Sequence, residues 1–197
     1  MPNKTIDYYN KNARRWAELK TNSFYHEEPF RIFEKLLDNK ARVLDIGCAY
    51  GIHVPLFLGI GRKLQYKGID VSGSMIKIAR SRYPQISFKL ADALNFKSDK
   101  KFDAFWSAAT LMHVPIKNWP KLLDNIRNNM KSGAIGYLTL PSTRPNPASS
   151  EDQRHFELLD ENTFKDTTQN MNWTIVKSGI LPSGADHIWF WYIVRLP

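Results

Sequence analysis

The 197-residue sequence predicts an α/β fold in which a seven-stranded, mostly parallel sheet is covered by helices on both faces. One observation is the segment 43–51, Val-Leu-Asp-Ile-Gly-Cys-Ala-Tyr-Gly, where a strand pattern runs into a loop with two glycines. A second is Asp70, which ends another predicted strand about twenty residues after the glycines, where a ribose-binding carboxylate is expected. Strand and helix patterns alternate along the rest of this region. Together these features predict a nucleotide site at the carboxyl edge of a parallel sheet.

Two helices are expected before the first strand, outside the repeating unit of the sheet. The first covers Thr5–Lys20 and takes Thr5 as its candidate N-cap. The second covers His26–Leu37, with Phe30 and Phe33 on its inward face.

The remaining elements follow in alternation. Strands are predicted at 41–46, 65–70, 86–90, 102–106 and 134–140, and helices at 52–60, 72–83 with Ser72 as N-cap, and 119–130. After a loop at 141–150 and a short helix at 159–170, strands at 173–178 and 187–195 predict an antiparallel hairpin at the end of the sheet. We expect one domain, 1–197, made of a helical cap at 1–40, a cofactor-binding core at 41–140, and a substrate-side loop with the C-terminal strands at 141–197.

Composition narrows the class of protein. Hydrophobic residues make up 43% and charged residues 24% of the chain, as in ordinary globular proteins. The net charge of +9 could indicate an acidic partner, but the lysines are dispersed, so we expect a solvated basic surface and not a nucleic-acid site. Charge alone does not exclude nucleic acid, and the sequence leaves the oligomeric state open.

The single cysteine, Cys48, excludes an internal disulfide and fits a reducing cytoplasm. No apolar run approaches the length of a membrane span, and the first residues lack the apolar segment of a secretory signal. A cytoplasmic protein without a membrane partner is therefore expected.

The glycine loop favours a nucleotide without phosphates. A dinucleotide site would place a third glycine at the start of the following helix, where this chain has Ile52 and His53. The Gly-Lys-Ser/Thr sequence of a phosphate-binding loop is also missing. S-adenosylmethionine fits better, because the loop then approaches an amino acid and a ribose.

Four segments resemble the class I S-adenosylmethionine-dependent methyltransferases, and more narrowly the small type 11 and type 25 methyltransferase-domain proteins. Residues 43–51 resemble the first motif, Gly-Ile-Asp-Val-Ser-Gly-Ser-Met at 68–75 the second, and Leu-Ala-Asp-Ala-Leu at 90–94 the third. Residues 102–115 resemble the fourth strand and its following loop. The resemblance covers about residues 41–140 and implies a Rossmann-like fold, S-adenosylmethionine as cofactor and methyl transfer as activity.

The resemblance also implies site residues. Asp45 would act on the methionine amino group, directly or through water, Asp70 would hold the ribose, and Asp92 would accept from the adenine amino group. Ala49 stands where the family usually has glycine, and its methyl group could crowd the methionine portion of the cofactor. The full expected cofactor-binding set is Tyr9, Trp16, Asp45, Gly47, Ala49, Gly51, Asp70, Val71, Met75, Asp92, Ala93, Ser107 and Ala108. Tyr9 and Trp16 would belong to a lid over the cofactor, the alternative being ordinary core residues.

His113 is the candidate general base, since it follows the fourth strand and histidine titrates near neutrality. Histidines at this family position are also commonly structural. The segment Pro141–Phe156, with Arg144, Arg154 and His155, is expected to form a wall of the substrate pocket, with a surface loop as the alternative. No metal site is expected, because the histidines lack metal-ligand spacing.

Several absences bear on the methyl acceptor. Cys48 lies inside the first motif and so cannot be the attacking thiol of a cytosine-C5 enzyme. The fourth strand is not followed by an Asn/Asp-Pro-Pro-aromatic signature, and no carboxylate lies between Ala104 and His113. A small-molecule acceptor is therefore expected, with a thiol, hydroxyl or amine as nucleophile and in-line displacement as the reaction.

Two alternative functions remain open at this point. One is a non-catalytic module that binds S-adenosylmethionine or S-adenosylhomocysteine. The other is a nicotinamide-dependent oxidoreductase, although the chain has no Tyr-x-x-x-Lys pair to act on a carbonyl.

Overall fold

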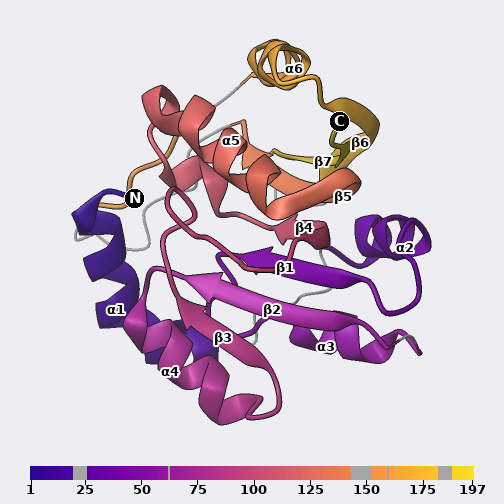
Figure 1. The fold of residues 1–197 in the computed structure, drawn as a ribbon. Coiled ribbons are helices and arrows are strands. Elements are labelled where there is room, and N and C mark those ends of the chain that lie inside the picture. Colours follow the sequence, from indigo (N-terminus) through magenta and orange to yellow (C-terminus); the bar gives the residue numbers. More distant parts are fainter. Residues whose placement is uncertain (20–25, 62, 143–151, 159, 182–187) are drawn as a thin grey trace.

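A seven-stranded sheet forms the centre of the computed structural model, which describes residues 1–19, 26–61, 63–142, 152–158, 160–181 and 188–197 (Figure 1). The strand order is β3-β2-β1-β4-β5-β7-β6. The strands are β1 (Arg42–Ile46), β2 (Gln65–Asp70), β3 (Ser87–Leu90), β4 (Phe102–Ser107), β5 (Met130–Pro141), β6 (Thr174–Leu181) and β7 (Trp189–Arg195).

The sheet is parallel in its first five strands and antiparallel at one end. Strand β1 pairs in parallel with β2 and β4, β2 pairs with β3, and β4 pairs with β5. Strand β7 is antiparallel to both β5 and β6. The predicted fold class and the antiparallel C-terminal strands are confirmed, and the carboxyl ends of β1, β2, β3 and β4 meet at one edge of the sheet.

The described residues form six α-helices around the sheet, and Figure 1 shows α1 beside α4. The helices are α1 (Asn3–Glu18), α2 (Glu27–Lys35), α3 (Val54–Gly59), α4 (Gly73–Arg82), α5 (Trp119–Asn129) and α6 (Glu161–Asn170), with 3-10 helices η2 (Leu111–His113) and η3 (Ile116–Asn118) between β4 and α5. No helix within the described ranges is long and apolar enough to cross a membrane.

The two predicted N-caps have different outcomes. Ser72 caps α4 as predicted, because its side chain accepts from the backbone N–H of Met75 at 3.2 Å. The prediction for Thr5 is wrong, since α1 already begins at Asn3 with Pro2 as its N-cap residue. Thr5 therefore lies inside the helix, fully buried, and its hydroxyl accepts from the backbone N–H of His155 at 2.9 Å.

Helix α5 and strand β5 meet earlier than the sequence predicted. The helix ends at Asn129, and β5 begins at Met130 instead of residue 134. Gly133, with φ +73°, lies within the strand, where the β4–β5 register shifts between Phe102 and Ala104. A position with positive φ at a strand irregularity favours glycine. Gly133 therefore marks a bulge in β5 and not the end of α5.

Alternate side chains of the strands pack into separate apolar layers. Val43 and Trp106 belong to the layer that α2 covers, in which Phe30 and Phe33 are buried as predicted. Leu44 belongs to the opposite layer, which is covered by residues of α5 and α6. Because successive side chains of a strand point to opposite faces, Asp45 shares the face of Val43 and Trp106.

Candidate cofactor site

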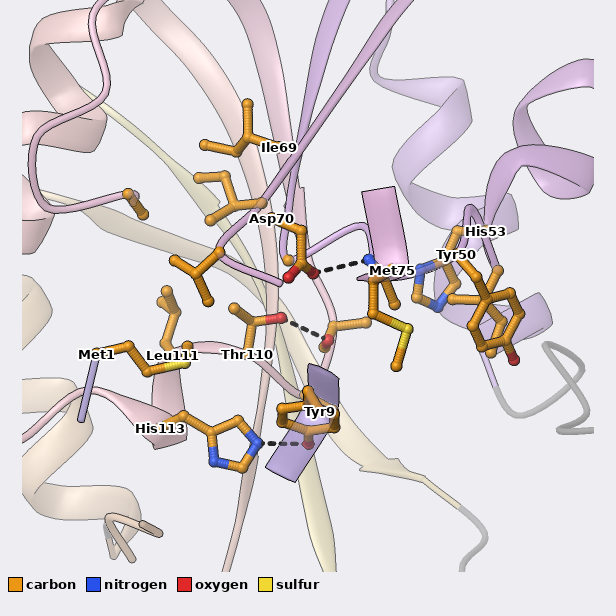
Figure 2. A pocket seen from close by; sticks show the side chains of 18 of the residues that line it. Met1, Tyr9, Tyr50, His53, Ile69, Asp70, Met75, Thr110, Leu111 and His113 are labelled. Carbon is orange, nitrogen blue, oxygen red and sulfur yellow. Dashed lines mark hydrogen bonds between the residues drawn. The ribbon is translucent and has the colours of Figure 1, made fainter. Parts of the chain in front are cut away.

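A cavity opens at the carboxyl edge of the sheet, with walls from α1 and from the loops after β1, β2, β3 and β4 (Figure 2). Its volume of about 210 Å³ is large enough for a small molecule, given that one water needs roughly 10–15 Å³ on the same measure. Ten of the thirteen predicted cofactor-binding residues line it, as does His113: Tyr9, Trp16, Gly47, Ala49, Asp70, Val71, Met75, Asp92, Ala93, Ala108 and His113.

Asp70 ends β2 and turns its carboxylate toward the cavity, as Figure 2 shows. One oxygen accepts from the backbone N–H of Ala49 at 2.9 Å, and the other accepts from Ser72 N–H at 2.8 Å. Burial raises the pKa of this carboxyl to about 6, although both backbone hydrogen bonds act in the opposite direction. A carboxylate has about four acceptor positions, so Asp70 retains capacity for hydroxyl donors of a ligand.

Asp92 lies two residues after β3 and lines the cavity beyond Asp70. Its Oδ1 accepts from the backbone N–H of Leu94 at 2.9 Å, and its Oδ2 lies 3.0 Å from the amine of Met1. Met1 therefore engages one oxygen of the carboxylate that is expected to accept from an adenine amino group. A ligand amino group at Oδ2 would have to replace this amine.

The glycine loop after β1 owes its shape to three residues with positive φ: Gly47 (+76°), Ala49 (+47°) and Gly51 (+81°). A Cβ on Gly47 would lie 2.0 Å from Oγ1 of Thr110, so the position requires glycine for both backbone and packing. Gly51 does not line the cavity and closes the turn by donating its N–H to the carbonyl of Cys48 at 2.8 Å. The left-handed conformation of Ala49 explains why glycine would be favoured there.

Two other predicted residues, Asp45 and Ser107, lie beneath the cavity and do not line it. Asp45 is 1% exposed and accepts a hydrogen bond from the hydroxyl of Tyr66. Ser107 is fully buried and donates to the carbonyl of Ile46 at 3.3 Å. The pleat of the strands turns both side chains into the packed layers of the sheet.

Both ring nitrogens of His113 are engaged. Nδ1 donates to the backbone carbonyl of His155 at 2.6 Å, which leaves Nε2 to accept from the hydroxyl of Tyr9 at 2.8 Å (Figure 2). Burial lowers the pKa of His113 to about 4. In this arrangement His113 has no ring nitrogen available to take a proton from a substrate.

Arg154 joins this network from outside the cavity. It donates to the Tyr9 hydroxyl at 3.1 Å and holds Asp152 through two hydrogen bonds of 2.8 and 2.6 Å. Its guanidinium also lies 4.7 Å from the ring centroid of Tyr8 and 5.0 Å from that of Phe156. The segment 152–158 is thereby fastened to α1, whereas Arg144 of the predicted pocket wall lies outside the described residues.

Sequence reasoning missed two histidines in the cavity wall, His26 and His53. Nδ1 of His26 forms a 2.8 Å hydrogen bond with the hydroxyl of Tyr137, and burial lowers the pKa of His26 to about 3. His53 is 4% exposed, and its Nδ1 lies 3.9 Å from Oδ2 of Asp45. His53 had a sequence signal, since it follows the glycine loop directly, but the position of His26 depends on how α2 packs.

The cavity wall carries acidic, aromatic and imidazole groups. Among the described residues that line it, none is a lysine or an arginine. Across the described part of the chain, no group of three or more His, Cys, Asp or Glu side chains could hold a metal ion.

Residues 43–133 match the methyltransferase domain family. A protein of Invertebrate iridescent virus 6 that is named as a methyltransferase, 235L, is 36% identical over 104 residues, which are 53% of this chain and 38% of the relative. A trans-aconitate 2-methyltransferase of Variovorax paradoxus is 28% identical over 129 residues, 62% of this chain and 49% of the relative. The matches to these relatives thus span less than half of their length.

Solved structures share the fold over nearly the whole chain. The 1,6-didemethyltoxoflavin-N1-methyltransferase of Burkholderia thailandensis superposes with a TM-score of 0.79 at 15% identity, covering 98% of this chain and 88% of the other. Magnesium protoporphyrin IX methyltransferase of Synechocystis PCC 6803, solved with S-adenosylhomocysteine, gives a TM-score of 0.76 at 15% identity and covers 100% of both chains.

The matched segment and the fold agree on one class of protein. Residues 43–133 match the methyltransferase domain family, and the fold around them is that of the class I S-adenosylmethionine-dependent methyltransferases. The resemblance that the four sequence motifs indicated is confirmed, and the comparisons agree with S-adenosylmethionine as the cofactor.

Proposed function

We propose that the protein transfers a methyl group from S-adenosylmethionine to a small-molecule nucleophile by in-line displacement. The observation that carries this proposal is the pair of carboxylates, Asp70 and Asp92, that face one cavity from the ends of neighbouring strands beside a glycine loop. This arrangement suits a nucleoside, whose hydroxyl and amino groups donate to carboxylates.

The cavity wall fits a nucleoside better than a dinucleotide. Met75, Leu111 and Ala91 offer apolar contacts to a base, and Gly47 lets a ligand approach the backbone closely. Helix α3 begins at Val54 without a glycine at its start, which argues against the pyrophosphate of a nicotinamide cofactor, because that group binds closely at such a helix N-terminus. These features support S-adenosylmethionine over the oxidoreductase alternative.

The residues of the chain would bind the cofactor, orient the acceptor toward it and exclude water from the site. When bound, S-adenosylmethionine supplies a methyl group already activated by the sulfonium, so that alignment of the acceptor is the main contribution of the protein. Asp70 would hold the ribose hydroxyls and Asp92 the base. Tyr9 and Trp16 would cover the cofactor from α1, held in place by Arg154 and His113.

No general base is assigned to His113, because both of its nitrogens are already engaged. We therefore favour an acceptor whose nucleophile needs little help to deprotonate. A tricarboxylate such as trans-aconitate, the acceptor named for several relatives, would require cationic side chains in the wall. The described lining contains no lysine or arginine, and the amine of Met1 is already paired with Asp92. An acceptor of low charge fits this wall better.

A labelled-methyl assay on the purified protein tests the reaction, with metabolite fractions, tRNA and protein offered as acceptors. Transfer of label to a small molecule is expected, and labelling of tRNA or protein alone would contradict the proposal. Binding of S-adenosylhomocysteine without turnover on any acceptor would favour the non-catalytic alternative.

Asp70→Asn tests the cofactor site independently of the acceptor. The affinity for S-adenosylhomocysteine should fall about 10- to 100-fold, because a charge-assisted hydrogen bond to a ribose hydroxyl is lost. Asp103→Asn is the matched control, since Asp103 contacts Lys131 and the backbone of Arg42 far from the cavity wall. An equal affinity of wild type and Asp70→Asn for S-adenosylhomocysteine would contradict the assignment of Asp70 to the ribose.

A further inference from the structure

Three carboxylates follow one another along the carboxyl edge of the sheet. Asp92 comes after β3, Asp70 ends β2 and Asp45 lies in β1, and these strands are consecutive neighbours. If the first two hold the base and the ribose, as proposed above, the amino-acid portion of the cofactor extends over β1. The third carboxylate, however, does not line the cavity.

His53 stands between Asp45 and the cavity. It lies in the turn that follows the glycine loop, and it lines the cavity while its Nδ1 lies 3.9 Å from the Asp45 carboxylate. The oxygen that His53 faces, Oδ2 of Asp45, also accepts from the Tyr66 hydroxyl, which fixes the carboxylate. Figure 2 shows His53 on the cavity wall, on the opposite side of Asp70 from Met1.

The hydrogen-bonding capacity of His53 is unused. The side chain is 5% exposed, and neither ring nitrogen has a hydrogen-bond partner within the described residues. Buried polar atoms without partners are uncommon and costly, so such an atom in a cavity wall indicates a missing ligand or water. His26, the neighbouring imidazole, differs because Tyr137 of β5 already occupies its Nδ1.

We propose that His53 connects Asp45 to the α-ammonium group of the cofactor's methionine portion; this inference rests on the proposed function. A carboxylate can only accept, so the Nδ1–H of His53 points to Asp45. A neutral imidazole in that tautomer presents the lone pair of Nε2, which accepts from an ammonium N–H. The 3.9 Å separation shortens on binding, as catalytic hydrogen bonds commonly do when a ligand arrives.

This assignment changes the role of Asp45. The resemblance implies that Asp45 acts on the amino group directly or through water, but its burial leaves the carboxylate one side chain away from the ligand. His53 is thus a positioning residue for the cofactor: it would fix the amino-acid end while the nucleoside end is held by Asp70 and Asp92.

Titration calorimetry of His53→Gln with three ligands tests the proposal. S-adenosylhomocysteine carries the whole amino acid, its analogue without the α-amino group lacks the ammonium, and 5′-methylthioadenosine lacks the amino-acid portion. The variant should lose about 10- to 100-fold in affinity for S-adenosylhomocysteine, the range for one charge-assisted hydrogen bond. Its affinities for the other two ligands should equal those of wild type, which also shows that the variant is folded.

Asp103→Asn is the control, because Asp103 contacts Lys131 and the backbone of Arg42 and does not line the cavity. All three of its affinities should equal those of wild type. His53→Asn is the second variant and should show the same ligand-selective loss as His53→Gln.

Two results would overturn the inference: an unchanged affinity for S-adenosylhomocysteine, or an equal loss for all three ligands, which would mean that His53 only supports the loop. Failure of both variants to fold would likewise assign His53 to the stability of the loop. If wild type itself binds none of the ligands, the proposed function fails, and that outcome is distinct from the others.

Discussion

Replacing Ala49 with glycine should stabilise the protein. Ala49 has φ +47°, and an L residue in the left-handed region is disfavoured by roughly 1–2 kcal/mol. Glycine adopts this conformation readily but loses about 0.5–1 kcal/mol more chain entropy on folding than alanine. The half-buried methyl group, which packs near Ala13 and Met75, contributes about 0.4 kcal/mol at half the value for a buried methylene. The expected net gain in the free energy of unfolding is therefore about 0.4 kcal/mol.

Urea denaturation with two matched substitutions resolves an effect of this size. Lys40→Gly relieves a positive φ of +67° at an exposed position and should also stabilise, whereas Ala17→Gly in α1 should destabilise by about 1 kcal/mol. The affinity for S-adenosylhomocysteine should not fall in Ala49→Gly, because the amide that donates to Asp70 remains. A loss of stability as large as that of Ala17→Gly would refute the reasoning.

Two further predictions concern the buried charges and imidazoles. Arg154→Gln should lower the free energy of unfolding by about 3–5 kcal/mol, because it leaves the Asp152 carboxylate buried without its guanidinium partner. Urea denaturation should show that the double variant Arg154→Gln/Asp152→Asn recovers part of this loss. Losses that simply add in the double variant would contradict the pairing. Stability should also fall between about pH 6.5 and pH 4, because burial lowers the pKa of His26 to about 3 and of His113 to about 4, so the unfolded chain binds more protons. Asp70, whose pKa is raised to about 6, changes the stability in the opposite direction, but it is a single group and the two histidines outweigh it. Urea midpoints measured across this range check the sign, and a constant or rising midpoint would contradict it.

The sequence predicted the sheet well because its strands are short apolar runs with clear ends. Residues at those ends, such as Asp70 and Asp92, could be assigned to one edge, since parallel strands bring their carboxyl ends together. The direction in which each strand side chain points was harder to predict. Asp45 lies one residue before the end of β1 and therefore turns into the layer beneath the cavity instead of facing it.

Contacts between distant segments could not be read from local patterns. The sequence makes His113 a candidate base, but in the structure its two ring nitrogens form hydrogen bonds with Tyr9 and with the carbonyl of His155. These partners lie 104 and 42 residues away along the chain, so no local pattern predicts them. Thr5 likewise fits an N-cap pattern, yet its hydroxyl bonds to the backbone of His155. His26 reaches the cavity wall because it precedes α2, whose Phe33 packs against Trp106 and Tyr137.

Calorimetric titration of the wild-type protein with S-adenosylhomocysteine and, separately, with NADH tests the central claim most directly. Asp70, Asp92 and the glycine loop predict that S-adenosylhomocysteine binds with one molecule per chain. NADH should not bind, because the helix after the glycine loop begins at Val54 without the third glycine that a pyrophosphate site needs. Binding of NADH, or binding of neither ligand, would contradict the assignment of the cavity to S-adenosylmethionine.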